Sequence, residues 1–189
     1  MGGLIFAAPA SGSGKTTVTL GFLRAVARNG MAIRSAKSGP DYIDPRFHAA
    51  ASGRACVNLD AWAMTPDRLR SLAYRQSDET LLIEGAMGLF DGAPPNGKGA
   101  TADLARVLGL PVVLIIDCSR MAGSVAAIAR GFMSHADDVT VAGVILNNVG
   151  SARHEAMLRN ALTGVTIFGA VPRDTALVQP SRHLGLQQA

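Results

Sequence analysis

The sequence predicts an α/β fold with a mostly parallel sheet and helices on both of its faces. The first observation is that apolar runs of strand length alternate with segments whose apolar residues recur at helical spacing. Such alternation is typical of the strand–helix–strand units that build parallel sheets. The second observation is a glycine-rich run at residues 8–17, between the first apolar run and the first helical segment. This context favours the fold type of the P-loop nucleoside triphosphatases.

Length and composition limit the function further. A chain of 189 residues is long enough for one domain with a proper core, and no apolar run is long enough to span a bilayer. The net charge is +4, but Lys and Arg are scattered and aromatic residues are few. An anionic small molecule therefore explains the charge as well as a nucleic acid does, and we expect neither nucleic acid nor membrane as partner. Cys56 and Cys118 lack metal-ligand spacing, which fits a reduced, cytoplasmic setting.

The first half of the chain holds three expected strands. The strand at residues 3–8 leads into the glycine-rich run, and a helix follows because Val18, Phe22 and Val26 share one helical face. A second strand is expected over 32–36 and a third over 80–83. Between them we expect a short helix beginning near residue 65, with Trp62 before it as a packing anchor.

The second half of the chain continues the alternation. Thr101 is expected to cap a short helix that Gly109 closes, and Ser151 to cap a later helix. Val125, Ile128 and Phe132 mark a helix between these two. Strands are expected at residues 111–117, 141–146 and 165–170.

A phosphate-binding loop is predicted at APASGSGKTT, residues 8–17. Gly12 and Gly14 allow the backbone N–H groups to curl inward and, with the helix N-terminus, to form an anion site. Lys15 would reach the β- and γ-phosphates of ATP, and Thr16 would bind Mg²⁺. The alternative is a glycine-rich turn with a solvated lysine, but the flanking strand and helix favour a nucleotide site. The nucleotide-binding residues expected here are Gly12, Ser13, Gly14, Lys15, Thr16 and Thr17.

The segment KSGPDYIDPRFH, residues 37–48, follows the second expected strand. It is too polar and too rich in Gly and Pro for a core element, and loops at this edge of a parallel sheet carry functional sites. Lys37 could neutralise a transferring phosphoryl group, whereas Asp41 and Asp44 could hold Mg²⁺ directly or through water. The residues that could meet a substrate are Tyr42, Arg46 and His48.

Two acidic residues have alternative interpretations. Asp44 could cap a helix that has Pro45 at its first position, a role compatible with metal binding. Glu84 ends the strand at 80–83, where a second Mg²⁺ contact is expected beside a phosphate loop, although it could be a plain strand-end charge. Asp117, at the end of another strand, ranks below Glu84 as a metal-linked acid. The glycines after Glu84, Gly88 among them, would let the backbone approach a ligand.

Asn147 is the candidate for recognition of the nucleotide base. It follows the strand at 141–146, and an amide side chain can donate and accept hydrogen bonds at once, as the edge of adenine requires. A turn-forming role has similar weight on the sequence alone. Pro172, after the last expected strand, is assigned to the nucleotide site together with Asn147.

Four motifs now occur in order along the chain: APASGSGKTT (8–17), KSGPDYIDP (37–45), EGAMGLFDG (84–92) and RHLGL (182–186). Together they resemble the N-terminal ATP-binding synthetase domain of the cobyrinate or hydrogenobyrinate a,c-diamide synthases, over essentially the whole chain. Pro9, in the place of the usual first glycine of the loop, is itself what that family shows. The wider fold relatives are dethiobiotin synthetase and the ParA and MinD partitioning ATPases.

The resemblance implies an ATP- and Mg²⁺-dependent amidation of the a and c acetate groups of a corrin ring. The family is thought to phosphorylate each carboxylate, after which ammonia attacks the acyl phosphate. The catalytic residues would then be Lys15, Lys37, Asp41 and Asp44. The metal ligands would be Thr16, Asp44 and Glu84, and the substrate contacts Tyr42, His48 and Gly88.

One departure from the family concerns the source of ammonia. The family continues into a glutamine amidotransferase domain with a cysteine nucleophile, and neither Cys56 nor Cys118 sits in such a motif. We therefore expect an ATP-binding synthetase domain over residues 1–175 and the start of a linker to the absent domain over 176–189. The expected partners are a corrinoid polycarboxylate, ammonia or a glutaminase domain, and a second copy of the chain.

Two rival functions use related folds. A dethiobiotin synthetase-like ligase also makes a phosphorylated intermediate, but GPDYIDP at residues 39–45 argues against it. A ParA- or MinD-like switch ATPase usually carries an extra lysine early in the loop, where this chain has Pro9, Ala10 and Ser11.

Overall fold

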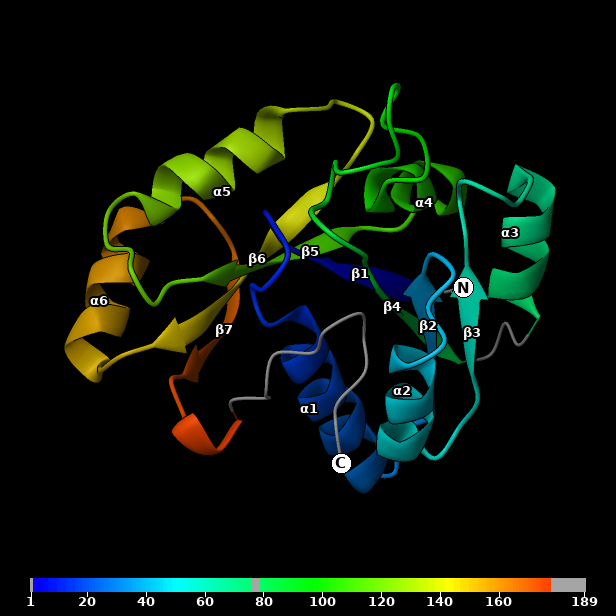
Figure 1. Ribbon diagram of the computed structural model, residues 1–189. Helices are drawn as coiled ribbons and strands as arrows, with labels where there is room; N and C mark the ends of the chain where they lie inside the picture. Colours follow the sequence, from blue (N-terminus) through cyan, green and yellow to red (C-terminus); the bar gives the residue numbers. More distant parts are fainter. Residues whose placement is uncertain (1, 76–78, 178–189) are drawn as a thin grey trace.

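The computed structural model describes residues 2–75 and 79–177, which form one seven-stranded sheet with helices on both faces (Figure 1). Every strand pair in it is parallel. The strands are β1 (Gly3–Ala7), β2 (Ile33–Ser38), β3 (Cys56–Leu59), β4 (Thr80–Glu84), β5 (Val112–Asp117), β6 (Val141–Val149) and β7 (Ile167–Pro172). The helices are α1 (Lys15–Arg28), α2 (Asp44–Ser52), α3 (Pro66–Tyr74), α4 (Thr101–Leu108), α5 (Val125–Ser134) and α6 (Ala152–Ala161), with a 3₁₀ turn at Thr175–Leu177.

The strand order β3-β2-β4-β1-β5-β6-β7 puts β1 at the centre of the sheet. The chain runs outward to one side of β1 and later to the other, so the strand order reverses next to β1. Ligands of open parallel sheets bind at the carboxyl ends of the strands where the order reverses. The loop after β1 lies at this point, which places the predicted phosphate loop at the site the topology favours.

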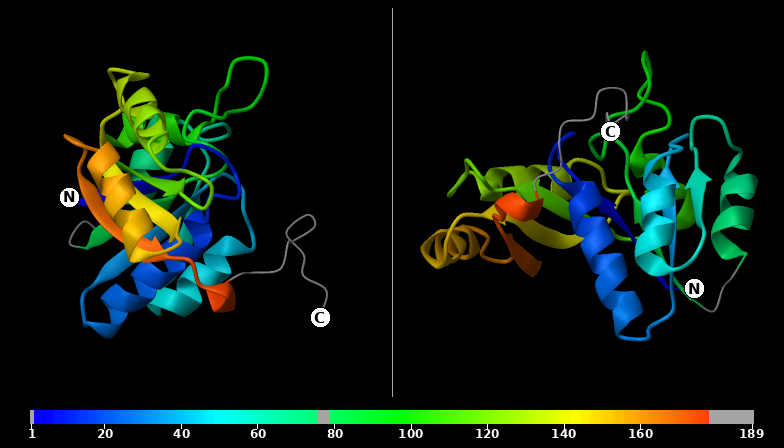
Figure 2. Two further views of the ribbon diagram at one scale, coloured as in Figure 1. Left: turned by 90° about the vertical axis from the view of Figure 1, so that its left-hand side faces the viewer. Right: turned by 60° about the horizontal axis from the view of Figure 1, so that its bottom comes forward.

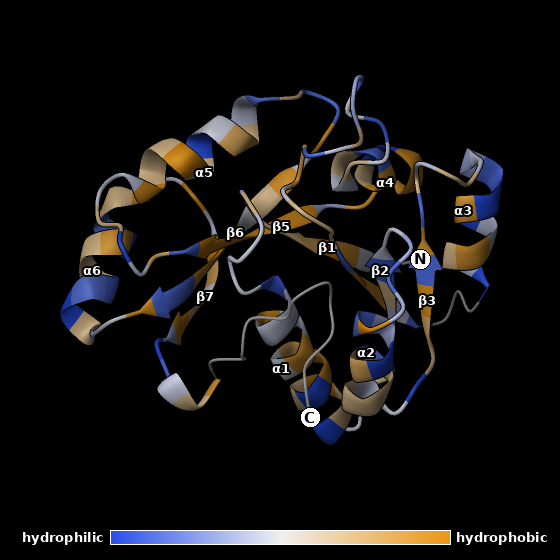
Figure 3. Cartoon of the chain, viewed as in Figure 1, coloured by the Kyte–Doolittle hydropathy of each residue, from blue (hydrophilic) through white to orange (hydrophobic). Residues whose placement is uncertain are grey.

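The core lies on both faces of the central strands. One face packs against α3, α4, α5 and α6, and the opposite face of the sheet packs against α1 with a contribution from α2 (Figure 2). Strands β4 and β5 are buried on both faces, which explains why they are almost continuously apolar (Figure 3). Among residues 2–75 and 79–177, no helix is long and apolar enough to cross a membrane.

The predicted fold class is confirmed, one strand was missed and three local expectations are wrong. Strand β3 was not expected. Trp62 is not a packing anchor, because 59% of it is exposed. Thr101 is the first residue of α4 and not its cap; its hydroxyl bonds the backbone of Ala86 instead. Asp44 likewise lies inside α2, and Asp41 accepts the backbone N–H groups of Ile43 and Asp44 at the start of that helix.

Other local expectations are confirmed. Ser151 caps α6 with its side chain, and α3 begins next to residue 65, where a helix was expected; its cap is Thr65. The RHLGL motif and the greater part of the expected linker, residues 178–189, lie outside the described residues.

Candidate functional site

The loop between β1 and α1 has the backbone that an anion site requires. Gly12 and Gly14 have φ angles of 79° and 84°, in the left-handed region that favours glycine. Gly14 directly precedes α1, and the Ser13 hydroxyl donates to the Ala10 carbonyl at 2.9 Å. The first N–H groups of α1 therefore remain available to an anion at the end of the helix that carries its positive dipole.

Lys15 is folded back over this loop. Its Nζ donates to the Met87 carbonyl at 2.6 Å and to the Ala10 carbonyl at 3.5 Å. Burial of the side chain, reinforced by the nearby positive charge of Lys37, lowers the pKa of Lys15. A polyanion in the loop would raise the pKa of Lys15 again, because it would supply a full negative charge where the two carbonyls offer only partial charge.

Glu84, the last residue of β4, is the centre of the site. Its Oε1 accepts hydrogen bonds from Thr16 Oγ1 at 2.6 Å and Lys37 Nζ at 2.8 Å, and the side chain is 0% exposed. Burial alone would raise the pKa of Glu84, but hydrogen bonds from His48, Lys37 and Thr16 together with the charge of Lys37 lower it. The buried carboxylate therefore stays ionised.

Lys37 bridges two acids. Its Nζ lies 2.9 Å from Asp44 Oδ2 as well as 2.8 Å from Glu84 Oε1. Burial by itself would lower the pKa of Lys37, but the two carboxylates outweigh it and raise the pKa. Strand register explains the meeting of these residues, because Lys37 on β2 pairs with Glu84 on β4.

His48 holds the other oxygen of Glu84. His48 Nε2 is 2.6 Å from Glu84 Oε2, and His48 Nδ1 is 3.4 Å from the Cys56 thiol. Burial would lower the pKa of His48, but the contacts with Cys56 and Glu84 raise it to about 9. The side chain is fully buried, so the expectation that His48 meets a substrate is wrong; it braces the carboxylate from behind.

The side chains of the polar loop after β2 have different surroundings. Asp41 Oδ1 accepts backbone N–H bonds from Ile43 at 2.8 Å and Asp44 at 2.9 Å, which fixes the turn into α2. Asp41 also lines the cavity beside the phosphate loop. Tyr42, by contrast, points away from the core and is 72% exposed. The structure thus brings Lys37, Asp41 and Asp44 together, whereas Tyr42 lies exposed on the surface.

Asn147 on β6 is tied to the phosphate loop. Its Nδ2 donates to the Ser13 carbonyl at 2.9 Å, and the side chain is buried. A Cβ added to Gly14 would lie 2.2 Å from the same nitrogen, so the close approach requires glycine at that position. In this state the amide donor of Asn147 supports the loop. Asp117, the lower-ranked acid, accepts hydrogen bonds from Ser119 and Asn148 and does not line the cavity.

The segment after β4 packs against the phosphate loop. Gly88 is buried, and a Cβ there would lie 2.6 Å from the Pro9 carbonyl, so this glycine serves a close contact between two loops. Met87, with a φ of 53°, presents its carbonyl to Lys15 and leaves its side chain exposed. No residue pattern pointed to Met87, because its contact with Lys15 uses a backbone group.

These groups surround a cavity of about 550 Å³ at the carboxyl ends of the strands. Its size lies in the usual range for small-molecule sites. The predicted residues that line it are Gly12, Gly14, Lys15, Thr16, Thr17, Lys37, Asp41, Glu84, Asn147 and Pro172. Met87 and Asn148, which were not predicted, line it too.

The side chains near Glu84 fit a divalent cation by their chemistry. One oxygen atom each of Asp44 and Glu84 contacts the ammonium of Lys37, and the Thr16 hydroxyl donates to the same oxygen of Glu84. Among residues 2–75 and 79–177, no group of three or more His, Cys, Asp or Glu side chains forms a complete metal cage. Mg²⁺ needs none, because it takes one or two carboxylates and completes its shell with water and substrate phosphates.

The central strand, the glycine-rich turn with its buried lysine and the acid on the neighbouring strand define a P-loop nucleotide-binding protein. Comparison with known proteins agrees with this class. The chain belongs to the family described as the CobQ/CobB/MinD/ParA nucleotide binding domain, which matches residues 4–186.

Two named relatives are similar along the whole of this chain. Hydrogenobyrinate a,c-diamide synthase of Brucella anthropi is 58% identical, and the protein of the same name from Rhizobium meliloti is 57% identical. The match spans 44% of the first relative and 45% of the second. The chain therefore spans less than half the length of these curated relatives.

Solved structures support the fold. The signal recognition particle 54 kDa protein of Aeropyrum pernix, in complex with GDP, has a TM-score of 0.60 at 16% identity over 95% of this chain and 43% of that one. The hydrogenase maturation factor HypB of Archaeoglobus fulgidus has a TM-score of 0.53 at 13% identity over 90% of this chain and 81% of its own. At such low identity the likeness concerns the fold alone.

Proposed function

We propose that this chain binds ATP with Mg²⁺ and uses the γ-phosphate to activate the a and c acetate carboxylates of a corrin-ring acid for amidation. The names of the relatives that match the whole chain support the substrate class. The observation that carries the proposal is the convergence of Thr16, Lys37 and His48 on buried Glu84 beside the phosphate loop.

The site suits phosphoryl transfer because it offers charge and positions groups without a protein nucleophile. The loop N–H groups and Lys15 would hold the β- and γ-phosphates, and Thr16, Asp44 and Glu84 would hold Mg²⁺. Bound Mg²⁺ would neutralise charge on the phosphate oxygens. Asn147 and Pro172, which also line the cavity, would contact the rest of the nucleotide.

The chemistry explains why ATP is consumed. A carboxylate oxygen of the acid attacks the γ-phosphorus, the bond to ADP breaks, and an acyl phosphate forms. Ammonia then attacks the acyl carbon, inorganic phosphate leaves with its bonding electron pair, and the nitrogen loses a proton to give the amide. Lys37 would move from its carboxylate partners toward the phosphoryl group as negative charge passes between the oxygens.

We further propose that ammonia reaches the site from a glutaminase domain or from solution, that the chain forms a homodimer and that it works in the cytoplasm. The free Cys56 and Cys118 thiols fit a reduced compartment. Light scattering with and without ATP tests the dimer: a mass of one chain under both conditions contradicts it.

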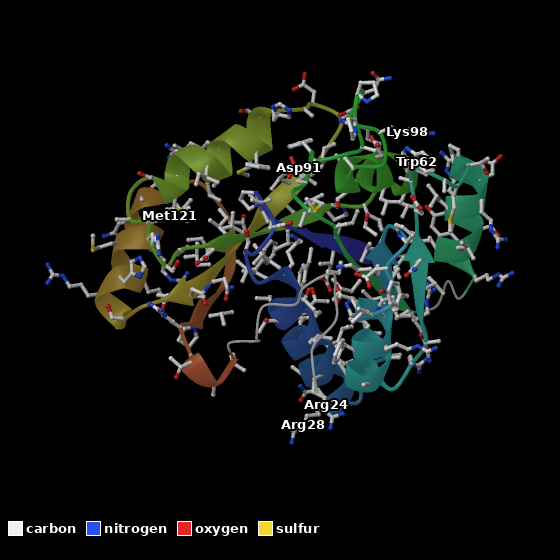
Figure 4. The ribbon with its side chains drawn as sticks, viewed as in Figure 1. Arg24, Arg28, Trp62, Asp91, Lys98 and Met121 are labelled. Atoms are coloured by element: carbon white, nitrogen blue, oxygen red, sulfur yellow. The ribbon has the colours of Figure 1, made fainter. Side chains whose placement is uncertain are left out.

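The test is an amidation assay with hydrogenobyrinic acid, ATP, Mg²⁺ and an ammonium salt, read by mass analysis of the corrin product. We expect amide formation that requires all four components and is lost in Lys15→Met. Arg28→Met is the matched control, because Arg28 is exposed at the far end of α1 (Figure 4). A rate of ATP turnover that is the same with and without the corrin acid contradicts the proposal, as does amidation by Lys15→Met at the rate of the control.

A further inference from the structure

Three large apolar side chains are exposed on one edge of the sheet. Tyr42 is 72% exposed, Trp62 is 59% exposed and Met87 is 59% exposed. They follow β2, β3 and β4 respectively, and these strands are neighbours in the order β3-β2-β4. Because the strands are parallel, all three side chains come from the edge that also carries the phosphate loop.

Exposed large apolar side chains that gather in one region mark an interaction site. The turn that carries Trp62 is fixed by hydrogen bonds and by packing. The Asp60 carboxylate accepts the backbone N–H groups of Trp62 at 2.9 Å and of Ala63 at 3.3 Å, which fixes the turn. Gly99 packs so closely on this turn that an added Cβ would lie 2.7 Å from the Trp62 Cβ.

A positive charge stands beside the exposed indole. Lys98 Nζ lies 6.0 Å from the centre of the Trp62 ring, and the two side chains are neighbours in Figure 4. The segment that carries Lys98 is closed on itself, since Ala93 and Lys98 pair as an antiparallel bridge and Ala93 N donates to Lys98 O at 2.8 Å. Gly99 N also donates to Asp103 on α4 at 2.8 Å. The cation and the aromatic face are thus presented together.

If the nucleotide fills the cavity beside the phosphate loop, the ring of the acceptor must bind to a neighbouring surface. The cavity lining of backbone, lysines and acids suits a nucleotide, and Trp62 and Lys98 do not belong to it. A macrocyclic acid has a broad apolar ring and carboxylates around its rim, so it needs an apolar platform with a cation at the border. The edge with Tyr42, Trp62, Met87 and Lys98 has this character.

We propose that Trp62 and Lys98, with Met87 beside the phosphate loop, form a platform that binds the ring of a macrocyclic polycarboxylate substrate. The ring lies against the Trp62 indole, Lys98 binds a carboxylate that does not react, and the reacting acetate reaches toward Lys37. The platform rests on the proposed function, because it assigns the acceptor for the same phosphoryl transfer. Tyr42, which the sequence predicts to contact the substrate, completes the rim.

Trp62 is the only tryptophan in the sequence, which makes direct binding measurable by its fluorescence. Titration with hydrogenobyrinic acid, without ATP, should quench the emission saturably, after correction with free tryptophan amide for light absorbed by the corrin. Lys98→Ala should weaken this binding by about tenfold, whereas Lys98→Arg should retain it. Quenching that does not saturate, or an unchanged affinity in Lys98→Ala, overturns the platform.

Turnover separates this inference from the function beneath it. In the amidation assay, Trp62→Ala should raise KM for the corrin acid about tenfold and leave KM for ATP within about twofold. Phe168→Ala is the matched control, since Phe168 is 57% exposed on β7, at the opposite end of the strand order. Wild-type turnover with an unchanged KM in Trp62→Ala refutes the platform alone, and a wild-type chain without turnover refutes the proposed function. A protein partner on this edge would show as a change in assembly with no change in KM, which also refutes the platform.

Discussion

Replacement of His48 by Gln tests whether a buried cation braces the Glu84 carboxylate. The contact of His48 Nε2 with Glu84 Oε2 at 2.6 Å is fully buried, so solvent does not screen it. Contacts with Cys56 and Glu84 together raise the pKa of His48 from 6.5 to about 9, which corresponds to about 3 kcal/mol of folding free energy. Gln retains a neutral hydrogen-bond donor of similar reach and removes the charge.

The sign of the pH dependence follows from the direction of the shift. A raised pKa means that the folded protein holds the proton more tightly, so the stabilisation is complete below pH 6.5. It declines as the pH rises toward about 9 and is lost above that value. The stability advantage of wild type over His48→Gln should therefore shrink with rising pH.

Urea unfolding of both proteins at about pH 6, 8 and 10, without nucleotide, measures this advantage. We expect the difference in unfolding free energy to fall by about 3 kcal/mol between the lowest and highest pH. A His135→Gln variant, on an exposed side chain after α5, controls for the assay. A difference between wild type and His48→Gln that is constant with pH refutes the buried ion pair.

Three further predictions concern the site. Gly14→Ala should abolish nucleotide binding in a fluorescent-nucleotide titration, because its Cβ would lie 2.2 Å from Asn147 Nδ2. Gly53→Ala is the control, since Gly53 also has a positive φ but no neighbour within 4 Å of an added Cβ, and this variant should still bind the nucleotide. Equal affinities of the two variants contradict the close contact. Lys37→Met should lower kcat by about a thousandfold and leave the Kd for ATP nearly unchanged, and an unimpaired kcat removes Lys37 from the transfer step. Glu84→Gln should raise the Mg²⁺ concentration needed for half-maximal turnover, and an unchanged Mg²⁺ requirement contradicts its role as a ligand.

The sequence predicted the elements that have strong local signals. The glycine-rich loop, the strand that ends in Glu84, the helix that begins near residue 65 and the cap Ser151 were all found where expected. Strand β3 was missed because it is a four-residue edge strand, CVNL, in which only Leu59 is buried. Its position depends on pairing with β2, and no local pattern encodes that pairing.

The candidate site was predicted in its residue types more than in its contacts. Lys37, Asp44 and Glu84 do lie together, as the positions at strand ends indicated. The buried role of His48 depends on Glu84, which lies 36 residues away, and therefore required the fold. Trp62 was misjudged because tryptophan is usually buried, and only the structure shows its exposed face.

The central claim is that an oxygen of the acceptor carboxylate attacks the γ-phosphorus of ATP. Hydrogenobyrinic acid with heavy oxygen in its acetate carboxylates tests it most directly, with ATP, Mg²⁺ and an ammonium salt present and mass analysis of the inorganic phosphate released. The account predicts one heavy oxygen in the phosphate for each amide formed. Amide formation with unlabelled phosphate would contradict it.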